Sequence, residues 1–243
     1  MIEPLGLTGE RTAPGIWHEN YWFARHEAAY RWVVAEVLPG VGGRLLEAGC
    51  GEGYGAEMLR AAGGGRVVGL DYEDTTLGHV RRAYPQVNVV RGNLVQMGFA
   101  AGSFGGLTSL QTIEHLWEQP RFVEECARVL APGGTAVLST PNRLTFPSGN
   151  WYHTRELTAA EFVELVAAEF EVTHALGLHH GPRLRAWEAA SGSCVDAQLA
   201  AEHDEWGPEL RELVTRTRYD DFEIRPGDLD ESLDLILVAK VPG

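Results

Sequence analysis

The sequence predicts an α/β protein built around a doubly wound, mostly parallel sheet with helices on both faces. Short apolar runs of strand length alternate with segments of helical periodicity over most of the 243 residues. A glycine-rich turn joins the first of these runs to the helix that follows it. No internal repeat interrupts the alternation. In sheets of this kind ligands bind outside the carboxyl ends of the strands, so we look for the functional residues there.

Seven segments have the apolar, β-branched composition of buried strands. The last of them follows the turn-forming residues Pro226, Gly227 and Asp228 and is rich in leucine, isoleucine and valine. In chain order the predicted strands are 44–49, 66–71, 87–92, 104–111, 135–140, 171–176 and 232–241.

Helices are predicted between these strands. An amphipathic amino-terminal helix begins near His26, the segments 55–62, 74–83 and 120–130 have helical spacing, and Thr158 with Glu161 forms a capping-box pattern. The stretch 178–225 lacks a clear period, and we interpret it as an insertion over the substrate side.

Composition narrows the possible partners. The formal net charge of −14 disfavours a nucleic-acid ligand, because lysine and arginine supply most of that affinity. No apolar run is long enough for a transmembrane helix or a signal peptide, so we expect a cytoplasmic protein without membrane attachment. The three cysteines are odd in number and outside any CxxC pattern, which indicates neither a disulfide framework nor a zinc knuckle.

The glycine-rich turn carries the most specific signal. Gly49, Gly51, Gly53 and Gly55 stand at alternate positions between a strand and a helix, and Glu47 precedes the first of them by two residues. Glycine lets the main chain approach a ligand, and the helix start offers free N–H groups. A nicotinamide-type GxGxxG turn would have glycine at position 54, where this chain has tyrosine, so a dinucleotide reductase is disfavoured.

An acid follows at the expected distance. Asp71 ends the second predicted strand about twenty residues after the turn, where a carboxylate can accept hydrogen bonds from both ribose hydroxyls of a nucleoside. Asn93 ends the third strand and has two interpretations, a contact to the adenine edge or a turn residue. The glycine turn and Asp71 together indicate a nucleoside-binding site.

These motifs resemble those of a known family. The run EAGCGEG, Asp71, the Gly92–Asn93 pair and the string RVLAPGGTAVLSTPN look like the successive motifs of class I S-adenosylmethionine-dependent methyltransferases, over residues 44–142. The resemblance implies a Rossmann-like sheet of seven strands with the last one antiparallel, and S-adenosylmethionine as cofactor. Asn93 departs from the aspartate that the family more often has. The cofactor contacts that we expect are Glu47, Gly49, Gly51, Asp71, Tyr72, Asn93, Leu94, Gln111, Tyr21 and Arg25.

We expect one methyltransferase domain over residues 1–243. Its predicted parts are an amino-terminal arm with a lid helix (1–43), the cofactor-binding core (44–142), substrate-side loops and helices (143–225) and the final strand (226–243).

Candidate catalytic residues follow the fourth strand. The string from Gln111 to His115 resembles the ExxEH metal site of ubiquinone-pathway and small-RNA O-methyltransferases, with Gln111 in place of the first glutamate. One interpretation is a divalent ion such as Mg²⁺, held by Glu114, His115 and His180. The other, equally open, is a metal-free site. The candidate general bases for deprotonating an acceptor hydroxyl are His153 and His115.

A narrower resemblance concerns the acceptor. The segment GERTAPGIWHENYWFARHEAAYRWV and the string QTIEHLWEQP look like actinobacterial sugar O-methyltransferases of polymethylated polysaccharide synthesis, including the type that methylates the 1-hydroxyl of short methylated mannosides. This resemblance implies a sugar or oligosaccharide acceptor. The alternatives are a small phenolic or quinone-like acceptor and a cofactor-binding protein without catalysis. A homodimer remains an expectation.

Overall fold

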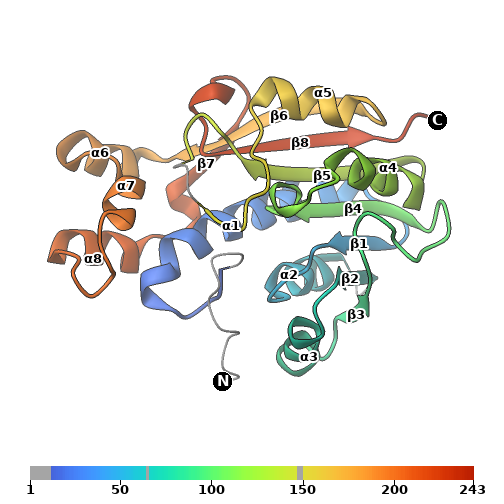
Figure 1. The fold of residues 1–243 in the computed structure, drawn as a ribbon, viewed down its shortest axis with the longest axis horizontal. Helices are drawn as coiled ribbons and strands as arrows, with labels where there is room; N and C mark the ends of the chain where they lie inside the picture. The colour runs from blue at the N-terminus through green and yellow to red at the C-terminus, as the bar shows by residue number, and fades with distance from the viewer. Residues whose placement is uncertain (1–11, 64–65, 147–149) are drawn as a thin grey trace.

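A computed structural model describes residues 12–63, 66–146 and 150–243 of the chain. The first eleven residues of the predicted arm and residues 147–149 of the predicted substrate-side loops therefore lie outside the described residues. Figure 1 shows one twisted sheet with helices on both faces and the insertion helices α6, α7 and α8 gathered at one end, beside α1. No helix in the described part of the chain is long and apolar enough to cross a bilayer.

The sheet has eight strands in the order β3-β2-β1-β4-β5-β8-β6-β7. The first five strands pair in parallel, and β8 pairs antiparallel with both β5 and β6. The predicted α/β class and the antiparallel last strand are confirmed. The strands are β1 (Leu45–Ala48), β2 (Val67–Asp71), β3 (Asn88–Arg91), β4 (Phe104–Leu110), β5 (Leu130–Pro141), β6 (Glu171–His180), β7 (Phe222–Arg225) and β8 (Asp234–Lys240).

The sheet has one strand more than the seven predicted. This strand, β7, lies within the segment 178–225 that we interpreted as an insertion without a clear period. Strand β6 continues four residues beyond its predicted end, to His180, and pairs there with β7, which the sequence did not reveal. Gly177 and the two histidines at the end of β6 carry no apolar alternation. The partner strand lies about forty residues away in the chain, with His180 opposite Phe222. Pairing with the distant strands β7 and β8 makes a strand of this segment, so local periodicity could not show it.

Two apolar cores cover the two faces of the sheet. Helices α1 and α2 pack in one core, and α4 and α5 pack in the other. Successive residues of β8 alternate between them: Leu235 and Leu237 face α5, whereas Ile236 and Val238 face the α1 side. The helices are α1 (Asn20–Trp32), α2 (Tyr54–Gly63), α3 (Asp74–Ala83), α4 (Gln119–Val129), α5 (Ala159–Ala167), α6 (Pro182–Ser191), α7 (Cys194–Leu199) and α8 (Pro208–Arg216).

Short helical turns and caps complete the framework. Thr158 caps α5, and Glu161 completes the predicted capping box. The loop after β5 is anchored by Asn142, whose Nδ2 donates to the carbonyl oxygens of Leu229, Asp230 and Ser232 at 3.0 to 3.1 Å. This anchor holds the loop at the carboxyl edge of the sheet, beside the turn η4 (Ile113–His115) that follows β4. The three cysteines are buried and unbridged.

Candidate active site

The glycine turn and Asp71 form one hydrogen-bonded unit. The Gly51 N–H donates to Asp71 Oδ2 at 3.0 Å, and the Glu73 N–H donates to Asp71 Oδ1 at 3.1 Å. Each carboxylate oxygen has more than one lone pair, so both can still accept a hydrogen bond from a ligand. Asp71 is 9% exposed at the end of β2. Its geometry fits a group with two neighbouring hydroxyls, as in a ribose.

The glycines of this turn serve two purposes. A Cβ atom on Gly49 would lie 2.6 Å from the Thr112 side chain, and one on Gly53 would lie 2.7 Å from Val80. All three glycines have left-handed φ angles, +83° at Gly49, +46° at Gly51 and +86° at Gly53, and at Gly49 and Gly53 close packing also excludes a side chain. Gly51 differs because an added Cβ would meet nothing within 4 Å. Open space beside a left-handed glycine is what close approach of a ligand to the main chain requires.

Glu47 is fully buried on β1 and is held from two sides. Tyr30 from α1 donates its hydroxyl to Oε1, and Thr108 from β4 donates to Oε2. Burial raises the pKa of Glu47 to about 7, although these two hydrogen bonds act to lower it. A side chain on Gly55 would overlap the Tyr30 ring, so this glycine makes room for the tyrosine. Glu47 therefore loses its proton near pH 7, and the resulting carboxylate can interact with a cationic group of a ligand.

The remaining predicted cofactor residues fall into different surroundings. Tyr72 is 63% exposed just beyond β2, whereas Leu94 is buried in the core. Asn93 Oδ1 accepts the Val95 N–H at 3.0 Å, as expected of a turn residue. Gln111 has a left-handed φ of +52°, and its Nε2 donates to Ser139 Oγ at 3.2 Å. Their contacts with a cofactor stay predictions.

Tyr21 and Arg25 have partners within the chain. Tyr21 is fully buried, with its hydroxyl 2.6 Å from His180 Nε2. Arg25 donates from Nε to Asp234 Oδ2 at 2.6 Å and from Nη2 to the Leu233 carbonyl at 2.7 Å. The prediction that these side chains reach the cofactor considered only their place in the arm. In the fold, both fasten α1 to the carboxyl-terminal strands. Their contact with the cofactor stays a prediction.

His26 is a third polar residue of α1, and it contacts the residue that follows Gly53 of the glycine turn. Its Nδ1 lies 3.1 Å from the Tyr54 hydroxyl at the start of α2. Burial lowers the pKa of His26 to about 4, and the charges of Arg25 and His115 act in the same direction. The imidazole is therefore neutral near physiological pH.

Two histidines meet beyond β4. His115 Nδ1 is 3.0 Å from the Tyr152 carbonyl oxygen, and His153 Nδ1 is 2.7 Å from Glu156 Oε1. The two rings lie edge to face with centroids 4.9 Å apart. The structure thus brings together both predicted general bases from separate loops. Glu156 lies only three residues from His153, whereas Tyr30 and Thr108 reach Glu47 from distant segments, so no local spacing could indicate these two partners.

Glu114 lies directly beside them and is almost fully buried. Its Oε2 accepts the Thr140 hydroxyl at 3.3 Å, and its backbone carbonyl accepts the Thr154 N–H at 2.7 Å. Burial raises the pKa of Glu114 to about 8. The carboxyl group is therefore mostly protonated at neutral pH and can ionise when a positive charge develops nearby.

The fold groups the candidate metal ligands differently from the prediction. Glu114, His115 and His153 have donor atoms within 4.8 Å of one another, whereas His180 belongs to a separate group with Glu188 and Cys194. His153 thus stands where His180 was expected, because β6 carries His180 into the packing of the insertion. Two imidazoles and one carboxylate fit Mg²⁺ poorly, since this ion prefers oxygen ligands in near-octahedral geometry.

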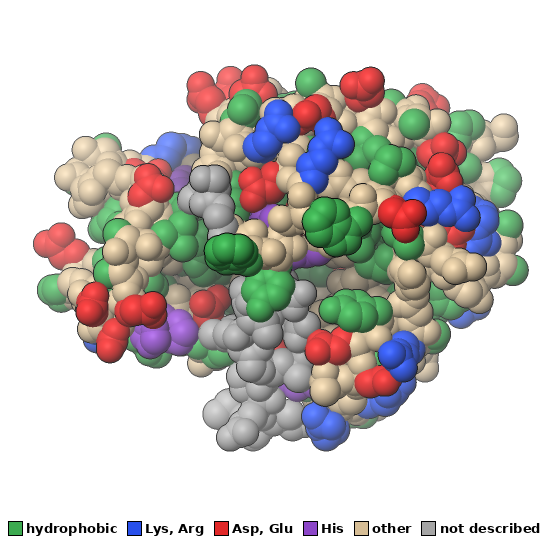
Figure 2. All heavy atoms as spheres, in the orientation of Figure 1, with side chains coloured by type: hydrophobic (Ala, Val, Ile, Leu, Met, Phe, Trp, Pro, Cys, Tyr) green, Lys and Arg blue, Asp and Glu red, His purple; other side chains and the backbone are tan. Residues whose placement is uncertain are grey.

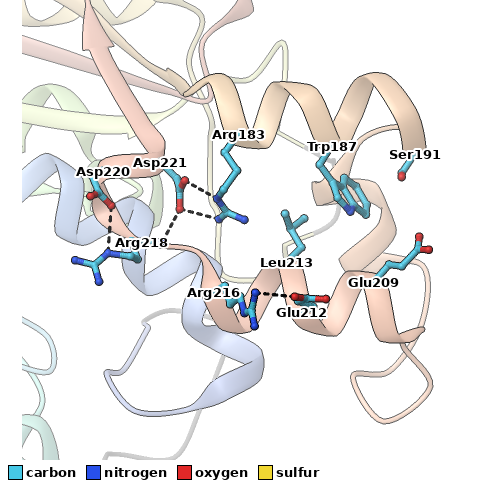
Figure 3. A pocket seen from close by; sticks show the side chains of 10 residues that line it. All are labelled: Arg183, Trp187, Ser191, Glu209, Glu212, Leu213, Arg216, Arg218, Asp220 and Asp221. Atoms are coloured by element: carbon cyan, nitrogen blue, oxygen red, sulfur yellow. Dashed lines mark hydrogen bonds and ion pairs between the residues drawn. The ribbon is translucent and has the colours of Figure 1, made fainter.

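A cavity of about 690 Å³ lies elsewhere, between α6 and α8. Figure 3 shows Arg183 directed at Asp221 and Arg216 at Glu212 along its wall, with N···O distances of 2.6 and 2.8 Å. Neither the glycine turn nor the histidine pair lines this cavity. It is distinct from the candidate active site.

Comparisons with known proteins agree with the geometry. Residues 46–138 match the methyltransferase domain family. A protein of Mycolicibacterium smegmatis described as a probable S-adenosylmethionine-dependent methyltransferase is 46% identical over 250 residues, covering 98% of this chain and 96% of the relative. A ubiquinone biosynthesis O-methyltransferase of Psychrobacter cryohalolentis is 26% identical over 185 residues, covering 66% of this chain and 72% of that protein.

A solved structure shows the same fold. The crystal structure of an S-adenosylmethionine-dependent methyltransferase from Mesorhizobium loti superposes with a TM-score of 0.57 at 20% identity, covering 89% of this chain and 98% of that chain. Together with the M. smegmatis relative, these findings show that the chain belongs to the S-adenosylmethionine-dependent methyltransferases, and S-adenosylmethionine is its methyl donor.

Proposed function

We propose that this methyltransferase transfers the methyl group to a hydroxyl group of a sugar or oligosaccharide, with His115 as the general base. The observation that carries the proposal is the group of His115, His153 and Glu114 at the carboxyl end of β4. A hydroxyl is a weak nucleophile and must lose its proton as it attacks. An acceptor of this kind needs a base at the edge of the sheet where ligands bind.

The hydrogen bonds of the two histidines favour His115 as that base. A carbonyl oxygen can only accept, so His115 Nδ1 must carry the hydrogen that points to Tyr152. A neutral His115 then has its lone pair on Nε2, the nitrogen that can take a proton. In His153, Nδ1 donates to Glu156 and Nε2 lies 3.1 Å from Asn150 Nδ2, so its lone pair already accepts a hydrogen bond. His153 therefore supports the site.

Glu114 complements this role. Bound S-adenosylmethionine supplies a methyl group that its sulfonium sulfur makes electrophilic. His115 Nε2 accepts the hydroxyl proton and becomes cationic 4.0 Å from Glu114 Oε1. The proton of this carboxyl group passes to solvent, and the resulting carboxylate stabilises the imidazolium. No divalent ion is required by this scheme.

Exposed aromatic rings support a sugar acceptor. Trp117 and Trp151 are 87% and 98% exposed, and each lies two residues from one of the paired histidines. Figure 2 shows hydrophobic side chains around a hollow on this face, in which histidine atoms are visible. Flat rings with a polar edge stack on the apolar faces of sugars.

The test is transfer of labelled methyl groups to a panel of mannosides, methylated mannosides, glucosides and phenols, with and without a chelator. We expect sugar methylation that is indifferent to the chelator and that falls by about 10²- to 10⁴-fold in kcat for His115→Ala. His153→Ala should retain more activity, and Arg216→Ala in the wall of the cavity between α6 and α8 should match the wild type. Wild-type rates for His115→Ala would refute its role as base.

The second candidate is a phenolic or quinone-like acceptor, which the likeness to the ubiquinone biosynthesis O-methyltransferase favours. A phenol loses its proton more readily than a sugar hydroxyl, so such an acceptor depends less on His115. Methylation of phenols and of no sugar in the panel would select this candidate.

A further inference from the structure

Outside the active site, four polar side chains from four elements converge where the insertion packs on α1. Tyr21 comes from α1, His180 ends β6, Glu188 lies in α6 and Cys194 begins α7. Tyr21, His180 and Cys194 are buried, and Glu188 is partly accessible. None of these side chains belongs to the group of Glu114, His115 and His153 from which the base was proposed.

Their spacing matches that of ligands around one ion. Cys194 Sγ lies 3.7 Å from His180 Nε2. A tetrahedral Zn²⁺ ion with bonds of about 2.3 Å to sulfur and about 2.1 Å to nitrogen separates these two donors by about 3.6 Å. The Tyr21 oxygen lies on the same side, 2.6 Å from His180 Nε2. It must withdraw by a fraction of an ångström for the three donors to surround an ion.

The far side of the imidazole is also arranged as in metal sites. Glu188 Oε2 lies 2.9 Å from His180 Nδ1, and Glu188 Oε1 accepts the Cys194 N–H at 3.0 Å. Histidines that bind metal ions commonly donate their second ring nitrogen to a carboxylate, which fixes the tautomer and the ring orientation. Here that bond leaves the lone pair of His180 on Nε2, facing Cys194 and Tyr21.

We propose that Tyr21, His180 and Cys194 bind a zinc ion or a similar divalent transition metal, with Glu188 orienting His180. Zn²⁺ binding displaces the thiol proton of Cys194 and the phenol proton of Tyr21, and both protons go to solvent. The two anions balance the charge of the ion, and water supplies a fourth ligand. Because the ligands come from α1, β6 and α7, the ion fastens the insertion to the helix that also holds Glu47 through Tyr30.

The experiment uses the full chain, stripped with a chelator and titrated with Co²⁺. A thiolate ligand gives Co²⁺ an intense sulfur-to-metal charge-transfer absorption, which sites built from imidazole and carboxylate lack. We expect this absorption to saturate at one ion per chain, to disappear when Zn²⁺ is added, and to be absent in Cys194→Ser and His180→Ala. Zn²⁺ should also raise the melting temperature of the wild type.

Matched control variants show whether the Co²⁺ absorption comes from this site or from another part of the protein. Cys126→Ala removes another buried thiol and His115→Ala removes the histidine of the active-site group, so both should keep the absorption. Glu188→Gln retains all three ligands and should weaken Co²⁺ binding by about 10- to 100-fold, which tests the site even if Cys194→Ser does not fold. A wild type without the absorption, or a Cys194→Ser variant that keeps it, overturns the proposal.

Discussion

The amino-terminal and carboxyl-terminal halves of the sheet hold their functional side chains in different ways. Around β1 and β2, the glycine turn presents main-chain groups and Asp71 accepts the N–H of Gly51, although Glu47 on β1 is also held by side chains from distant segments. Around β6 and β8, buried side chains from distant segments pair with one another, as Arg25 does with Asp234. A turn of main chain is encoded by neighbouring residues, whereas a buried pair depends on the whole fold.

The largest expected effect is a loss of stability when the buried ion pair of the carboxyl-terminal half is broken. Arg25→Ala leaves the Asp234 carboxylate buried without its partner, and breaking a buried ion pair costs about 3–5 kcal/mol in the free energy of unfolding. Chemical denaturation measures the loss. Arg216→Ala, which removes an exposed pair with Glu212, is the matched control and should leave the midpoint unchanged. A loss below about 1 kcal/mol for Arg25→Ala would mean that the pair is solvated.

The second prediction concerns the cofactor half. Asp71→Ala should lower the affinity for S-adenosylmethionine by about a hundredfold or more, because hydrogen bonds to a charged group contribute about 1.5–3 kcal/mol each. Titration calorimetry measures this change. The control is Asp74→Ala, which removes an exposed carboxylate that pairs with Arg91 nearby. If both variants bind equally well, Asp71 does not contact the ribose.

Two glycine substitutions sharpen the comparison further. Gly55→Ala places a methyl group against the Tyr30 ring and should destabilise the fold by about 1–3 kcal/mol. Gly51→Ala meets no atom of the protein, so its stability cost is the left-handed backbone alone, about 1–2 kcal/mol. Its main effect should be on cofactor binding. Thermal unfolding and calorimetry on both proteins separate the roles, and unchanged cofactor affinity for Gly51→Ala would contradict the proposed open approach.

The smallest expected effect is a change in the pH dependence of the affinity for S-adenosylmethionine. The Tyr30 hydroxyl lowers the pKa of Glu47, so Tyr30→Phe should raise that pKa above its value of about 7. The family resemblance places Glu47 near the ammonium group of the cofactor, so we expect affinity in the wild type to rise as Glu47 ionises and the pH increases through about 7. In Tyr30→Phe the rise should come at higher pH. Affinities of wild type, Tyr30→Phe and a Tyr219→Phe control between about pH 6 and 9 test this, and superimposable profiles would contradict it.

Local motifs and contacts between distant residues differ in how far the sequence could predict them. The strand alternation, the glycine turn and Asp71 followed from local pattern, and the antiparallel last strand followed from the family resemblance. The partners of Glu47, the place of His180 and strand β7 did not, because each depends on contacts between residues far apart in the chain. Tyr21 and Arg25 were predicted as cofactor contacts, and their place in the sequence could not show that they also bind His180 and Asp234.

Gln111 has a consequence for engineering. Its left-handed backbone carries a cost that glycine would avoid, yet its side-chain amide is held by Ser139 at the edge where ligands bind. A designer seeking a more heat-resistant protein would choose Gln111→Gly first. The same exchange removes the amide, so the gain in robustness should come with slower turnover.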